Sequence, residues 1–233
     1  MILYQGPSML DGKPIVVIAT GFAKASQNSK TGAMIQTYII RSDISPIDAN
    51  RTNEDFSICG NCVHKGDMGK NRSCYVTLIH GPMGVWKAFN RGIYPAIDID
   101  KFAGKTIRVG SYGDPAAVPM EIWQKILSKA AGWTGYTHQW KTIDKKWSKL
   151  VMASADSIDD SIAAMAKGYR TFRVSANAHP VKKMEVICPA SEEMGKKTNC
   201  LSCKACMGTS GKAKVSIVIP AHGTGKKYVE MDA

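Results

Sequence analysis

The chain of 233 residues has no hydrophobic stretch of about 20 residues, the length that a membrane-spanning helix needs. Its longest apolar runs, residues 15–19 and 35–40, have only the length of strands. The first residues lack a charged segment followed by an apolar one, and so predict no signal peptide. We therefore expect one globular domain, residues 1–233, in the cytoplasm and without a membrane partner.

The sequence also lacks familiar catalytic motifs, and its acidic residues are too few to balance the basic ones. The sequence contains no P-loop, no dinucleotide-binding fingerprint, no zinc-protease motif and no Ser-His-Asp order. Only 19 acidic residues stand against 31 lysines and arginines, and the net charge is +12. This basic protein is predicted to bind nucleic acid, an anionic cofactor or an acidic partner protein, or to use lysine-rich faces only for solubility.

The cysteines give the clearest indication of function in this sequence. Seven cysteines cannot all pair within one chain, and a reducing cytoplasm disfavours disulfides. Clustered cysteines in that setting are typical of metal ligands. They fall into two groups, one in residues 59–74 and the other in residues 188–206.

The second group gives the sharper prediction. Cys200, Cys203 and Cys206 form a C-x2-C-x2-C run, and Cys188 precedes it in the chain. The same tight spacing recurs in ferredoxin-type iron–sulfur ligation. Structural zinc sites more often combine two separated C-x2-C hooks. The sequence therefore favours an iron–sulfur cluster of the 4Fe-4S type over zinc, with free thiols as the remaining alternative.

The first group, Cys59, Cys62 and Cys74, is one ligand short. Its fourth position is either left open for a substrate or cofactor, or filled by one of three nearby side chains: His64, Asp67 or His80. The two groups form either two metal centres or one shared centre. Each group is locally self-sufficient within its own stretch of chain, residues 43–78 and 188–206, which favours two centres.

Residues 105–191 alternate between strand and helix patterns, which predicts an α/β core with a parallel sheet. We expect a partial or small (β/α) barrel, TIM-barrel-like, preceded by a hairpin of residues 15–19 and 37–41. Helices are predicted at residues 85–91, 118–131 and 157–167. Small or polar residues follow the strands and are expected to form a site rim: Ser111, Gly113, Asp114, Thr137, His138, Ser154, Asp156, Ser175, Asn177, Cys188 and Ser191.

Several stretches resemble a family of uncharacterised, cysteine-rich proteins encoded by bacteriophages. The resemblance lies in residues 58–64 (ICGNCVH), 108–119, 132–140, 168–174 and 186–191, and extends over most of the chain. It implies a location in the cytoplasm of the host cell, and it implies no particular activity.

The order of parts is also similar to that of radical S-adenosylmethionine enzymes. The resemblance implies that Cys59, Cys62 and Cys74 correspond to the three-cysteine cluster loop of that family. It also implies that Gly113, Asp114 and Pro115 correspond to the segment that meets the methionine amino group. The second cysteine group would then correspond to an auxiliary cluster at the C-terminal end.

Three classes of function follow from the sequence. The first is an iron–sulfur protein on a radical-SAM-like partial barrel, acting as a redox enzyme or with S-adenosylmethionine as a cofactor. The second is a protein stapled by zinc or an iron–sulfur cluster that binds nucleic acid or a host protein without catalysis. The third is an electron-transfer or redox-sensing module with closed clusters.

Overall fold

The computed structural model describes residues 1–229. Its strands are β1 (Ile2–Pro7), β2 (Pro14–Thr20), β3 (Ile35–Arg41), β4 (Thr106–Tyr112), β5 (Gly132–Thr137), β6 (Met152–Ala155), β7 (Thr171–Ser175), β8 (Glu185–Ile187) and β9 (Ser216–Pro220). Its helices are α1 (Pro46–Arg51), α2 (Phe56–Cys59), α3 (Gly81–Asn90), α4 (Met120–Leu127), α5 (Ile158–Ala166) and α6 (Cys200–Cys203). Short 3-10 turns connect them: η1 (Val63–Lys65), η2 (Ile99–Phe102), η3 (Pro115–Ala117), η4 (Gln139–Lys141), η5 (Lys145–Lys149) and η6 (Lys226–Tyr228).

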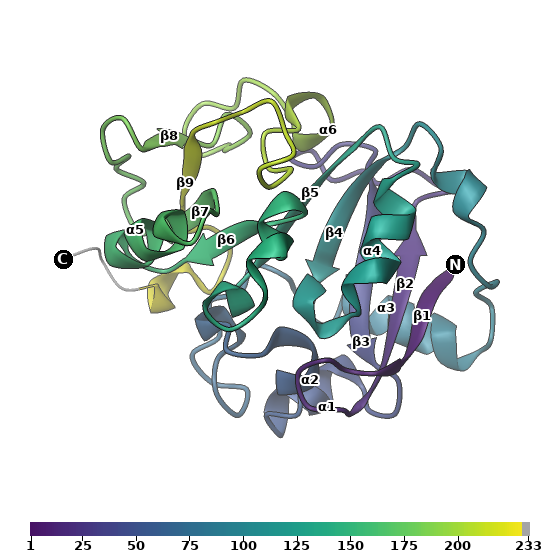
Figure 1. The fold of residues 1–233 in the computed structure, drawn as a ribbon. Helices are drawn as coiled ribbons and strands as arrows, with labels where there is room; N and C mark the ends of the chain where they lie inside the picture. Colours follow the sequence, from purple (N-terminus) through teal and green to yellow (C-terminus); the bar gives the residue numbers. More distant parts are fainter. Residues whose placement is uncertain (230–233) are drawn as a thin grey trace.

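The described strands form one sheet in the order β1-β2-β3-β4-β5-β6-β7-β9-β8 (Figure 1). β1, β2 and β3 pair antiparallel, and the pairings from β3 to β8 are parallel. The predicted hairpin and the predicted α/β class with a mostly parallel sheet are therefore confirmed. β1 and β8 are the two edges, so the sheet within residues 1–229 is not closed into a barrel.

The apolar run of residues 15–19 becomes the centre of β2, where every side chain is buried. A continuous apolar run is expected where both faces of a strand are covered. The same core contains Phe102 from η2, Trp123 from α4 and Ile107 from β4. This core holds the N-terminal half of the sheet in place.

Two helix predictions can be compared with the structure. Ser157 caps α5, accepting from the backbone N–H of Asp160 at 3.0 Å, as predicted for a helix beginning there. The helix expected at residues 118–131 is shorter, because α4 ends at Leu127. Ala131 donates its N–H to the carbonyl of Lys105 at 2.8 Å. That contact turns the chain toward the sheet, so Gly132 begins β5 and does not end a helix.

Alternation along the parallel strands separates two faces. Ile107, Val109 and Ala153 belong to the main core, which also contains α4 and α5 residues. The intervening side chains line a cavity on the opposite face: Arg108, Thr134, Tyr136, Ser154, Phe172, Val174, Ile217 and Ile219. Because a strand turns successive side chains to opposite faces, one sheet builds both the core and the cavity wall.

The first cysteine group and the C-x2-C-x2-C run of the second group lie near opposite ends of the parallel strands. The carbonyl of Cys206 accepts from Gly135 in β5, and Arg170, directly before β7, binds the carbonyls of Ala205 and Gly208. Figure 1 shows α6 at the opposite end of β4 from α1 and α2. Cys200, Cys203 and Cys206 are thus close to the amino ends of the strands, and the first group is close to their carboxyl ends. Cys188 directly follows β8. None of the helices in residues 1–229 combines the length and apolar character that a bilayer crossing requires.

Candidate metal centre

A cavity of about 350 Å³ lies on the sheet face described above, a volume typical of small-molecule sites. Six cysteines line it: Cys62, Cys74, Cys188, Cys200, Cys203 and Cys206. Cys59 lies in α2, outside the cavity wall. The chain therefore brings both cysteine groups to one cavity, although they approach it from different ends of the strands.

Local backbone contacts fix the second group. Asn199 caps α6 by accepting from the N–H of Ser202 at 3.0 Å. The N–H of Cys200 donates to the carbonyl of Lys30 at 2.9 Å, which attaches α6 to the segment before β3. Lys204 then adopts a left-handed backbone conformation, with φ of 51°, and reverses the chain toward Cys206. This turn places three thiols of one short segment on the cavity wall.

Arg108 brings a buried positive charge to the cavity. Its guanidinium donates to the hydroxyl of Tyr75 at 2.7 Å and to that of Tyr136 at 3.4 Å. Burial by itself lowers the pKa of Arg108, but Tyr75, Tyr136 and the thiols of Cys200 and Cys206 raise the pKa overall. A permanently charged guanidinium close to the second group favours any anionic species held there.

Lys30 is a second cation near the same thiols. Its Nζ lies 3.2 Å from Nε2 of His222, and both side chains line the cavity. Burial lowers the pKa of Lys30, and the thiols of Cys188 and Cys200 oppose that shift. A negative charge at the second group would stabilise the ammonium form, so the lysine and the thiols favour each other's charged states.

Burial controls the thiols of the second group. It raises the pKa of Cys206 to about 12 and also raises the pKa of Cys188, where the neighbouring Cys200 and Cys203 act in the same direction. At neutral pH these two thiols therefore keep their protons in the metal-free chain. A metal releases such protons when it binds, because only thiolates are good ligands.

The first group has a different environment. Burial raises the pKa of Cys59 well above its usual value, and burial also raises the pKa of Cys74. The guanidinium of Arg72 hydrogen-bonds to Cys74 and donates to the carbonyl of Val76 at 3.0 Å. Cys62 instead points toward His138, with its Sγ 3.8 Å from Nε2. The three cysteines are neighbours, but their thiols have different partners.

The structure also places the three side chains proposed as a fourth ligand of the first group. Asp67 is exposed and accepts from the amide of Asn53 at 3.1 Å. His80 is exposed at the N-terminus of α3. His64 follows Cys62 on η1 and is mostly buried, with Nδ1 2.7 Å from the hydroxyl of Ser73. Of these candidates, His64 lines the cavity.

Gly113, Asp114 and Pro115, expected at a cofactor, lie outside the cavity wall formed by the described residues. Asp114 is buried, and burial raises its pKa. One of its carboxylate oxygens accepts from the N–H of Ala116 at 2.9 Å, and the other accepts from the N–H of His138 at 2.8 Å. The carboxylate thus caps η3 and holds the chain after β5, and its contact with a cofactor stays a prediction.

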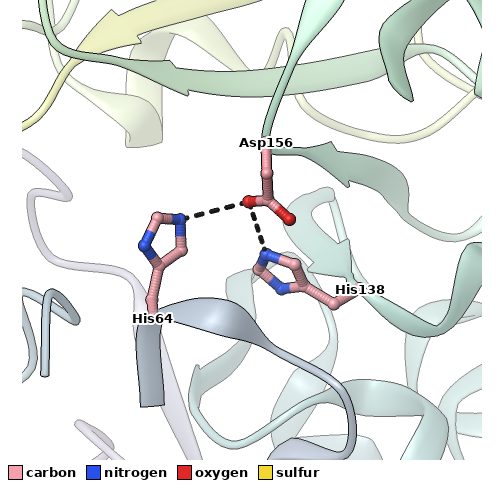
Figure 2. Close-up of side chains that lie close together, drawn as sticks. All are labelled: His64, His138 and Asp156. Carbon is pink, nitrogen blue, oxygen red and sulfur yellow. Dashed lines mark hydrogen bonds and ion pairs between the residues drawn. The ribbon is translucent and has the colours of Figure 1, made fainter. Parts of the chain in front are cut away.

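His64, His138 and Asp156 form a cluster of close side chains (Figure 2). Cys62 approaches this cluster at His138. Oδ1 of Asp156 is 3.2 Å from Nε2 of His138 and 3.4 Å from Nε2 of His64. Burial lowers the pKa of His138, but Cys62 and Asp156 raise it overall to well above its usual value. Burial raises the pKa of Asp156, and its contacts with the two imidazoles reverse that shift and lower it.

The sequence identified these three residues separately and not as a group. His138 and Asp156 each directly follow a parallel strand, β5 and β6, and neighbouring parallel strands bring such residues to one edge. That signal was present in the sequence. His64 joins them only because residues 60–74 fold back, with Cys74 N–H donating to the His64 carbonyl at 2.9 Å. No family model, curated protein or solved structure matches this chain.

Proposed function

We propose that this chain is an iron–sulfur protein with a redox function, and that Cys188, Cys200, Cys203 and Cys206 hold its cluster. The observation that carries the proposal is that these four thiols line one cavity together with the cations Arg108 and Lys30. Four soft thiolates suit an iron–sulfur cluster. A thiolate-bound cluster is anionic, and the two cations would offset its charge.

The spacing of the thiols supports a cluster over a single zinc ion. Zinc–sulfur bonds of about 2.3 Å place tetrahedral thiolates about 3.8 Å apart. Within residues 1–229, no three of the cysteine sulfurs gather within 4.8 Å of one another. A cluster of several irons does not need so close a group, because each thiolate binds a different metal atom.

When bound, the cluster would supply one-electron chemistry, and the residues of the chain would set its potential and its access. Arg108 and Lys30 favour the more negative, reduced state through their charge. Tyr136 hydrogen-bonds to Cys206 and stands in the cavity wall. Phe172, Ile217 and Ile219 form an apolar wall that limits the entry of water.

The same proposal has two more specific parts: the sheet is a partial barrel of the radical S-adenosylmethionine type, and the chain uses S-adenosylmethionine as a cofactor. The parallel sheet carries the cavity on one face, and Cys62 and Cys74 reach it from the carboxyl ends. A small cofactor placed there would lie between the two cysteine groups. Because Arg72 already hydrogen-bonds to Cys74, we favour a cluster ligated by four thiolates as the primary redox group.

Anaerobic purification followed by iron, sulfide and zinc analysis tests the proposal, together with electron paramagnetic resonance of the reduced protein. We expect a brown protein with about four irons and four sulfides per chain, or twice that with two clusters. A colourless protein with stoichiometric zinc would refute it. A change in the spectrum on adding S-adenosylmethionine would show an open iron, and an unchanged spectrum would indicate a fully ligated cluster.

Replacing Arg108 with glutamine should lower the reduction potential of the cluster. Removing a buried positive charge disfavours the more negative, reduced state, and a loss of about 1.4 kcal/mol corresponds to about 59 mV for one electron. Potentiometric titration measures the shift. Arg108→Lys keeps the charge and should shift the potential less, and Arg91→Gln, at an exposed position, should leave it unchanged. Equal potentials for Arg108→Gln and the parent protein would contradict this role.

One observation favours the alternative function, nucleic-acid binding. The turn η5 packs against residues 207–214, because Thr209 N–H donates to the Ser148 carbonyl at 2.8 Å. The two segments together expose five lysines: Lys145, Lys146, Lys149, Lys212 and Lys214. We expect binding to DNA or RNA at this surface to weaken steeply with salt and to decrease in Lys149→Glu. Fluorescence anisotropy at two salt concentrations measures both effects, and salt-independent binding would exclude a phosphate-based mode.

A further inference from the structure

The cluster of His64, His138 and Asp156 is built from three separate parts of the fold. His64 lies on η1, His138 directly follows β5, and Asp156 directly follows β6. Their side chains are mostly buried, with exposed fractions of 15%, 14% and 27%. Figure 2 shows both imidazole rings directed at the same carboxylate. Side chains from distant segments that converge on one point are the usual basis of a preorganised site.

The distances match a tetrahedral ion. Metal bonds of about 2.0–2.1 Å to imidazole nitrogen and about 2.3 Å to thiolate sulfur place neighbouring ligand atoms about 3.3–3.8 Å apart. Oδ1 of Asp156 lies 3.2 Å and 3.4 Å from the two imidazole nitrogens. Sγ of Cys62 lies 3.8 Å from Nε2 of His138. The two imidazole nitrogens and the carboxylate oxygen lie within 4.8 Å of one another, as three ligands of one ion must, whereas Cys62 stands outside this group and would complete it through a change of its side-chain rotamer.

The hydrogen bonds around the cluster leave a donor atom for such an ion. Nε2 of His64 is buried and makes no hydrogen bond within the described chain, although it lies at ion-pair distance from Asp156. Nδ1 of the same ring contacts the hydroxyl of Ser73 at 2.7 Å. A metal-bound imidazole typically uses its other nitrogen for an outer partner of this kind. Ser73 would therefore fix the ring with Nε2 facing the ion.

The backbone around the cluster is also held in place. The N–H of His138 donates to Asp114 at 2.8 Å, and that of Gln139 donates to the hydroxyl of Thr137 at 3.0 Å. Ser157, next to Asp156, caps α5. Asp114, which the resemblance to radical S-adenosylmethionine enzymes associates with a cofactor, thus has no direct contact with the three side chains of the cluster and acts through the backbone of His138. It positions the chain that carries His138.

We propose that His64, His138 and Asp156, with Cys62 as the fourth ligand, bind a single divalent transition-metal ion, preferentially Zn²⁺. Two imidazoles, a carboxylate and a thiolate are a ligand set that zinc accepts in tetrahedral geometry. Cys62 and His64 line the cavity, so the ion faces it from the carboxyl ends of β5 and β6. The proposal does not depend on the iron–sulfur cluster, whose four ligands are different residues. It assigns Cys62 to the ion and not to a cluster with Cys59 and Cys74.

Titration of chelator-treated protein with Zn²⁺ and Co²⁺ under anaerobic conditions tests the site. The parent protein should bind one ion more than His138→Ala or Asp156→Asn does. If a variant still binds that ion, the parent protein should bind it at least about tenfold more tightly than the variant. The Co²⁺ form should show the intense visible bands of tetrahedral cobalt and a thiolate charge-transfer band. That charge-transfer band should be absent from the spectrum of the same site in Cys62→Ser. His64→Gln provides a conservative variant in case an alanine variant does not fold.

Three controls separate this site from the cysteine groups. Cys203→Ser should keep the ion even if it loses the iron–sulfur cluster, and Cys74→Ser should keep it because Cys74 is not a ligand. His80→Ala, which removes an exposed histidine, should behave like the parent protein. The proposal is overturned if His138→Ala, Asp156→Asn and His64→Gln bind as many ions as tightly as the parent protein. It is also overturned if the cobalt bands disappear in Cys74→Ser and persist in His138→Ala.

Discussion

Replacing Cys203 with serine is expected to abolish the iron–sulfur cluster, with near-complete loss of iron, sulfide and visible absorption. Cys203 lies on α6 in the cavity wall, between Cys200 and Cys206 in the chain, and its loss leaves three thiolates. A serine hydroxyl stays protonated at neutral pH and is a poor ligand for the soft iron–sulfur unit. Metal and sulfide analysis of anaerobically purified protein measures the loss.

The matched control for Cys203→Ser is Ser202→Ala. Ser202 is exposed on the same turn, and its contact with the Asn199 cap uses the backbone N–H, which alanine keeps. This variant should retain the full cluster. If Cys203→Ser retained as much iron and sulfide as Ser202→Ala, the four-thiolate assignment would be wrong.

Replacing Glu185 with glutamine is expected to lower the free energy of unfolding by about 3–5 kcal/mol, because it leaves a buried charge without its counter-charge. Glu185 in β8 and Arg173 in β7 form an ion pair in which neither side chain is exposed. Nε and Nη2 of Arg173 donate to the carboxylate at 3.0 Å and 2.8 Å. The carboxylate also accepts from the N–H of Val181 at 3.1 Å. Urea denaturation of the two proteins measures the difference.

An exposed ion pair gives the comparison for Glu185→Gln. Lys129 and Asp100 lie 3.4 Å apart on the surface, and Lys129→Ala should cost only about 0–1 kcal/mol. The double variant Arg173→Met/Glu185→Leu should recover part of the loss, because it removes both buried charges together. An effect of Glu185→Gln no larger than that of Lys129→Ala would show that the pair does not stabilise β7 and β8.

Most of the sheet could be predicted because its signals are local. The apolar runs in β2, β4, β6 and β9 and the glycines or polar residues after them mark both the strands and their ends. β1 was not predicted, because its six residues include Gly6 and Pro7 and it lies at an edge. Residues of this kind are unfavourable inside a sheet but are tolerated at its edge.

The candidate sites were predictable only in part, since they depend on contacts between distant segments. Arg108 looks like any residue of a strand, and its importance appears only when β4 turns it toward the cavity. His64 was one of three candidates for the fourth ligand of the first cysteine group, and the fold directs it to Asp156. For Asp114 the local pattern suggested a site, but a Gly-Asp-Pro segment looks the same in a turn and in a cofactor site.

Arg170 holds residues 205–215, at the end of the second cysteine group, and this affects how freely that segment can change during evolution. Its guanidinium donates to three backbone carbonyls, those of Ala205, Gly208 and Val215. Carbonyl acceptors are present whatever the side chain is, so substitutions at Ala205 or Val215 leave these bonds intact. We therefore expect natural variation to spare Arg170 and the cysteines, and to accumulate in the residues between them.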